Sequence, residues 1–120
     1  MTTPRRLKTY SGESGYVYQY YFLESQTRTR WWSRMGTAFL FHVTGDRKRF
    51  FIVEVLVEDQ ALRVWERVHG RALGETEQYA AAKMRLFRAF DENQKPEEFA
   101  DVRVSASNIE SLLEPLHLGD

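Results

Sequence analysis

The chain has 120 residues, of which 42% are hydrophobic and 28% charged, and its 17 basic side chains balance its 17 acidic ones. This length and composition are typical of one folded domain and exclude a disordered chain. The absence of cysteine excludes disulfide scaffolds, thiol nucleophiles and Cys-based zinc sites.

The amino-terminal segment carries signals for irregular structure. Pro4 and the Ser- and Gly-rich run 11–15 disfavour helix and strand. We therefore expect a flexible arm over residues 1–15 and a single α+β domain over residues 16–120.

Three strands are predicted after this arm. Residues 16–23, 37–44 and 50–57 are rich in aromatic and β-branched side chains, which favour strands. Gly45 and Asp46 predict a tight turn between the last two strands. Two interpretations stay open for residues 24–36, a long connection or the twisted ends of a hairpin. Strands joined by such short returns form an antiparallel meander.

The apolar spacing becomes helical from residue 58. The first helix ends at Gly70, and a second, with a wide apolar face, is expected over residues 76–91. Val102 and Val104 suggest a short edge strand, and a last short helix ends near Pro115. The predicted fold is therefore α+β, in the order βββ-αα-β-α. It comprises a three-stranded antiparallel meander, with or without a fourth short strand, packed by two to three helices.

The most distinctive segment combines guanidinium groups with two indole rings. Its members are Arg28, Arg30, Trp31, Trp32 and Arg34. Arginines match phosphates and indoles stack on bases, so the segment is a candidate site for a protein partner or single-stranded nucleic acid. Alternatively, one tryptophan or both cap the core and the arginines only keep the loop in water.

An aromatic row forms the second candidate site. Tyr18, Tyr20 and Phe22 project from one face of the first predicted strand, because side chains alternate along a strand. We expect these three residues in a protein interface, since buried tyrosine hydroxyls each need a hydrogen-bond partner. The alternatives are core packing under the helices and stacking on nucleic-acid bases.

Neither metal nor acid–base chemistry has a clear signature. His42, His69 and His117 lie far apart and on different predicted elements, so we expect no metal site. Glu54 interrupts an apolar strand, and the simplest pattern points it outward, with Phe51 and Val53 among the inward residues. No catalytic residues or cofactor are predicted.

Two functional hypotheses follow from these patterns. The first is a non-enzymatic protein-interaction domain, expected as a homodimer, with a different protein as the alternative partner. The second is a single-stranded nucleic-acid-binding module. The basic bias of residues 1–50, which hold nine Lys or Arg against three Asp or Glu, favours the second. No run approaches the ~20 apolar residues of a membrane span, so we expect a cytoplasmic protein with no membrane partner.

Overall fold

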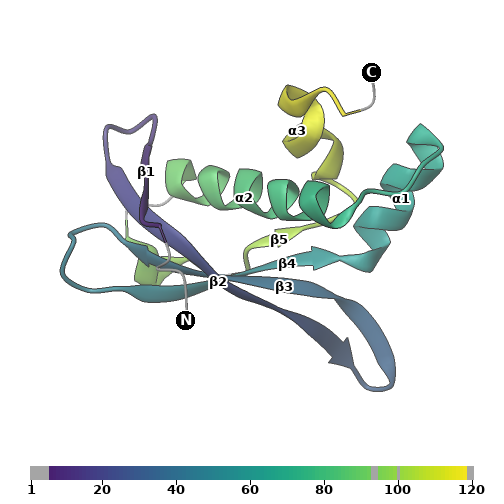
Figure 1. Cartoon of the computed structure of the whole chain (residues 1–120), viewed down its shortest axis with the longest axis horizontal. Coiled ribbons are helices and arrows are strands. Elements are labelled where there is room, and N and C mark those ends of the chain that lie inside the picture. The colour runs from purple at the N-terminus through teal and green to yellow at the C-terminus, as the bar shows by residue number, and fades with distance from the viewer. Residues whose placement is uncertain (1–5, 93–94, 100, 119–120) are drawn as a thin grey trace.

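A five-stranded sheet carries a layer of helices on one face (Figure 1). The computed structural model describes residues 6–92, 95–99 and 101–118. The strands β1 (Lys8–Ser11), β2 (Val17–Arg30), β3 (Ser33–Thr44) and β4 (Phe51–Glu58) pair antiparallel in that order, and β5 (Arg103–Val104) pairs parallel with β4. The α-helices are α1 (Asp59–His69), α2 (Glu75–Glu92) and α3 (Ile109–Leu113), and the 3-10 turns are η1 (Pro96–Glu98) and η2 (Glu114–Leu116).

This architecture confirms the predicted α+β class, with the antiparallel meander first, then helices, a short strand and a final helix. Residues 24–36 are the twisted ends of a hairpin rather than a long connection, because β2 and β3 pair as far as Arg30 and Ser33. None of the described helices is long and apolar enough to cross a membrane.

The expectation of a flexible arm over residues 1–15 is wrong for Lys8–Ser11. These residues form β1 on the edge of the sheet. Tyr10 holds the strand in place, since its ring stacks on Phe87 of α2 at 4.5 Å and its hydroxyl donates to Asp91 at 2.9 Å. Burial and the Asp91 carboxylate raise the pKa of Tyr10 to about 12. Residues 1–5 of the predicted arm lie outside the described residues.

The core lies between the sheet and α2. The inward side chains of β2, β3 and β4 meet the apolar stripe of α2, in which Leu86 and Phe90 have no exposed surface. Gly36 marks a close approach of two strands, because a Cβ atom there would lie 2.1 Å from the carbonyl oxygen of Val57. The other members of the buried cluster are Tyr18, Tyr20, Phe39, Phe41, Val43, Val53, Val55, Val57, Ala61, Trp65, Leu73, Ala81, Ala82, Ala89, Val102, Val104, Ile109, Leu112 and Leu113.

Two irregularities shape the long β2–β3 hairpin. The pairing register shifts between Phe22 and Glu24 and again between Arg28 and Thr29. Each such shift bends a strand and increases its twist. Figure 1 shows the far end of the hairpin projecting beyond the layer of helices. The hairpin therefore presents its turn away from the rest of the domain.

Candidate interaction surface

Two tryptophans form the turn of this projecting hairpin. Arg30 and Ser33 are the last paired residues, so Trp31 and Trp32 make a two-residue loop. The side chain of Trp31 is 80% exposed and that of Trp32 is 95% exposed. Their ring centroids lie 6.5 Å apart. We call this pair the tryptophan tip. The suggestion that one tryptophan or both cap the core is wrong for this structure.

The backbone at the tip adopts a costly conformation. Trp31 has φ of 60°, in the left-handed region that Gly or Asn usually occupies in hairpin turns. A residue with a β-carbon pays about 1 kcal/mol there. The chain thus places two large apolar rings in water on a turn that a smaller residue would form more easily. Arg47, Asp101 and His117 also have positive φ, so it is the combination of this backbone with two exposed indoles that makes the tip a candidate site.

The three arginines around the tip differ in how far they are engaged. Arg28 donates through Nε to Oε1 of Glu54 at 3.2 Å and through NH2 to the same oxygen at 2.5 Å. Hydrogen bonding to Glu54 raises the pKa of Arg28. Arg34 donates to Asp59 at 2.9 Å and to Thr37 at 2.8 Å. Arg30 is exposed beside the tip. Two of the three guanidinium groups are therefore already neutralised by carboxylates.

The aromatic row predicted as an interface lies largely in the core. Tyr18 is fully buried and stacks on Phe90 at 4.4 Å, and Tyr20 is buried against the edge of Phe87 at 5.6 Å. Burial raises the pKa of both tyrosines. The interface expected through them is corrected to core packing, because α2 covers this face of the sheet.

Phe22, the third member of the row, is partly buried and meets the ring of Tyr79 edge-on at 5.0 Å. The interface was predicted because buried tyrosine hydroxyls need hydrogen-bond partners. The rings of Tyr18 and Tyr20 are buried nevertheless, because aromatic side chains of α2 pack against them. The pattern of alternation was correct, but it did not reveal which face α2 would choose.

The opposite face of the sheet carries apolar side chains that the sequence analysis missed. Tyr21, His42 and Ile52 are cross-strand partners in one row, and Ile52 is 66% exposed. Phe50 lies beside them, with its ring 6.2 Å from Tyr21 and 5.0 Å from His42, and the Tyr21 hydroxyl hydrogen-bonds His42 Nδ1. Val17, four residues before Tyr21 on the same face of β2, is exposed too. We call these five residues the open-face patch.

A polar network separates the open-face patch from the tryptophan tip. Glu54, which pairs with Leu40 in register, lies on the open face as the alternation predicted. Arg28 reaches across to it and also donates to Gln26 at 2.6 Å. The open face therefore has an apolar patch at one end, a satisfied polar middle and two exposed indoles at the other end. Outward placement of Glu54 was the signal that could have located Ile52, two residues before it.

The histidines do not gather into a metal site. No group of three or more His, Cys, Asp or Glu side chains in the described residues could hold a metal ion. His42 belongs to the open-face patch, and His69 pairs with Glu110 at 2.6 Å on the helical side of the domain. His117 caps η2 with φ of 53°.

Comparisons with known proteins place the chain in no family. No family model matches it, and neither a curated protein nor a solved structure does.

Proposed function

We propose that this protein is an interaction module that forms a homodimer through its tryptophan tip and its open-face patch. The observation that carries the proposal is the exposure of Trp31 and Trp32, at 80% and 95%, on a turn that the larger side chains make costly. Large exposed apolar groups in water mark interaction sites, and Trp is the residue type most enriched among interface anchors.

A second copy of this chain is the partner that its own surface suits. It carries both the projecting anchors and an uncovered apolar surface able to receive them. Trp31 lies ten positions after Tyr21, at the end of β2, which is roughly 33 Å of extended chain. That distance prevents a chain from folding its tip onto its own patch. Two copies related by a twofold axis and laid antiparallel would each insert a tip at the other's patch, so that one contact is made twice.

The area involved suits a stable dimer. A buried tryptophan removes roughly 150–250 Å² from water, so four of them contribute on the order of 600–1,000 Å². The receiving patches contribute a comparable area. The total reaches the ~1,200–2,000 Å² of a standard specific interface. The Arg28–Glu54 network would form the polar part between the two apolar contacts.

Single-stranded nucleic acid is the competing partner. Binding to phosphates requires free positive charge, and Glu54 and Asp59 neutralise Arg28 and Arg34. This pairing favours a protein partner over a nucleic acid at the tip.

Sedimentation velocity over a concentration series tests the proposal. The wild type is expected to pass from 14.2 kDa monomer to dimer in the micromolar range, and Trp31→Ala with Trp32→Ala should weaken association at least ~30-fold. Val68→Ala serves as the control, because Val68 is an apolar residue of α1 that is 66% exposed and lies outside both contact regions.

Two results would overturn the proposal. One is a wild type that stays monomeric at 100 µM, the upper end of the range for a weak specific dimer, roughly −5.5 kcal/mol. The other is binding of a mixed-sequence single-stranded oligonucleotide that depends on Trp31 and Trp32 and weakens steeply with salt. The second result would assign the tip to nucleic acid.

A further inference from the structure

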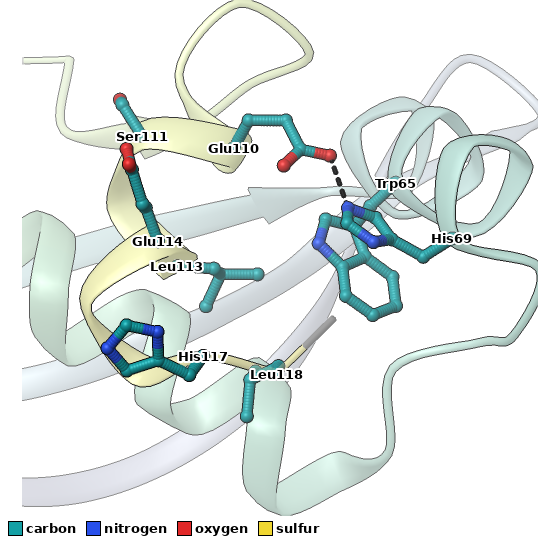
Figure 2. A pocket seen from close by; sticks show the side chains of 8 residues that line it. All are labelled: Trp65, His69, Glu110, Ser111, Leu113, Glu114, His117 and Leu118. Atoms are coloured by element: carbon teal, nitrogen blue, oxygen red, sulfur yellow. Dashed lines mark hydrogen bonds and ion pairs between the residues drawn. The ribbon is translucent and has the colours of Figure 1, made fainter. Parts of the chain in front are cut away.

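A pocket of about 540 Å³ opens between α1 and the carboxy-terminal elements α3 and η2. It lies on the helical side of the domain, away from the tip and the open face. Figure 2 shows Trp65 and His69 on one wall, contributed by α1, and Glu110 and Leu113 on another, contributed by α3. Leu118 closes the lower side. Its volume lies within the range of pockets that hold small molecules.

The indole N–H of Trp65 gives the pocket a hydrogen-bond donor. Trp65 is 1% exposed, with its ring stacked on His69 at 4.1 Å and the Arg71 guanidinium 5.1 Å from the ring centre. Figure 2 shows the indole nitrogen turned into the pocket. Within the described part of the chain, no hydrogen bond engages this N–H. The N–H is therefore open to the pocket and free to donate to an acceptor oxygen on a ligand.

Carboxylates give the same pocket a negative character. Glu110 accepts from Nε2 of His69 at 2.6 Å through one oxygen, which leaves its other oxygen for a donor. Glu114 adds a second carboxylate to the lining. Arg71, the nearest described guanidinium to Trp65, is engaged by Glu77 in a pair of 2.9 Å hydrogen bonds and donates to the Leu118 carbonyl. A cationic group is therefore favoured over an anionic one.

Leu113 and Leu118 provide the apolar part of the lining. The pocket thus presents a hydrogen-bond donor, an anionic acceptor and an aliphatic surface. Each of these three features fits one part of an amino-terminal residue. The ammonium suits Glu110, the carbonyl oxygen suits the Trp65 N–H, and an aliphatic side chain suits the two leucines.

We propose that the α1–α3 pocket binds the amino end of a peptide, or an amino-acid amide, with an aliphatic first side chain. A free amino acid should bind less well, because its carboxylate would lie near Glu110 and Glu114. An N-acetylated amide should not bind at this site, because it lacks the ammonium that Glu110 would hold.

Titration of ¹⁵N-labelled full-length protein with L-leucinamide tests this site. The indole N–H resonance of Trp65, identified by its loss in Trp65→Phe, should shift and saturate at millimolar ligand, whereas the indole resonances of Trp31 and Trp32 should stay in place. Such a weak ligand corresponds to a Kd of about 1–10 mM. N-acetyl-leucinamide at the same concentrations should produce no saturating shift.

Glu110→Gln should weaken leucinamide binding at least about tenfold, since it replaces a charge-assisted hydrogen bond with a neutral one. Glu66→Gln is the matched control, because Glu66 lies on the exposed face of α1 outside the pocket and should leave the affinity unchanged. A dispersed spectrum for Glu110→Gln verifies that the fold persists. The proposal is overturned if leucinamide leaves the Trp65 resonance unmoved at 50 mM, about five times the weakest Kd expected. Equal shifts from the acetylated amide, or unchanged affinity in Glu110→Gln, would also overturn it.

Discussion

Replacing Trp31 with asparagine should make the folded monomer more stable. Trp31 has φ of 60°, where a residue with a β-carbon pays about 1 kcal/mol and Asn pays less. The indole is 80% exposed, so its removal costs almost no core contact. Loss of the ring contact with Trp32, at 6.5 Å, offsets part of the gain. We expect the free energy of unfolding of Trp31→Asn to rise by roughly 0.5–1 kcal/mol.

Trp32→Asn is the matched control for this experiment. It removes the same ring contact, but Trp32 has no left-handed φ among the described backbone angles, so no strain is relieved. The difference between the two variants in the free energy of unfolding therefore measures the cost of the left-handed backbone at Trp31, which we expect to be about 1 kcal/mol.

Urea unfolding at ~1 µM protein, followed by far-ultraviolet circular dichroism, measures both variants. Each variant lacks one tryptophan of the tip, so at this concentration dimerisation adds little to the apparent stability of either. A difference of 1 kcal/mol corresponds to a midpoint shift of roughly 0.5 M urea. If Trp31→Asn is no more stable than Trp32→Asn, the turn is not strained and the backbone at Trp31 gives no support to a binding role for the tip.

Three further expectations concern the body of the domain. Leu86→Ala should lower the free energy of unfolding by about 2–5 kcal/mol in urea titrations, because Leu86 is fully buried in the stripe of α2, and a midpoint equal to wild type would show that α2 does not cover the core. Gly36→Ala should cost at least about 1–3 kcal/mol, since its Cβ would lie 2.1 Å from the Val57 carbonyl oxygen, and near-wild-type thermal stability would refute this strand spacing. The hydrogen bond from Arg71 lowers the pKa of Glu77 from 4.5 to about 2, so its contribution to stability is present above pH 4.5 and is lost as the pH falls toward 2. Glu77→Gln should flatten the acid limb of the stability profile in that window, and an unchanged acid limb would argue against the pair.

Much of the fold follows from local pattern. Aromatic and β-branched runs predicted the meander, and the change to helical spacing after Val57 placed the start of α1 within two residues. β1 was missed because Gly12 and Gly15 next to it signal a loop, whereas Lys8–Ser11 are stabilised by partners distant in sequence. Tyr10 owes its position to Phe87 and Asp91, about 80 residues further along the chain.

The candidate site was predictable only in part. The Trp31–Trp32 pair stood out in the sequence. Its exposure, however, depends on where the hairpin ends. The two register shifts, which lie at Leu23 and Met35, help to set that position. The choice between the two faces of β2 could not be made locally, because both carry tyrosines. Packing of α2 decided it, burying Tyr20 and leaving Tyr21 on the open face.

A complementation experiment tests the reciprocal dimer most directly. One variant lacks the tip, through Trp31→Ala and Trp32→Ala, and the other has a disabled patch, through Ile52→Arg. Each homodimer would lose both of its contacts, whereas a mixed dimer would retain one intact tip on one intact patch. Sedimentation velocity should find each variant alone as a 14.2 kDa monomer at a concentration where the wild type is dimeric, and their equimolar mixture should form dimer. A mixture that remains monomeric while the wild type dimerises would contradict the pairing of tip with patch.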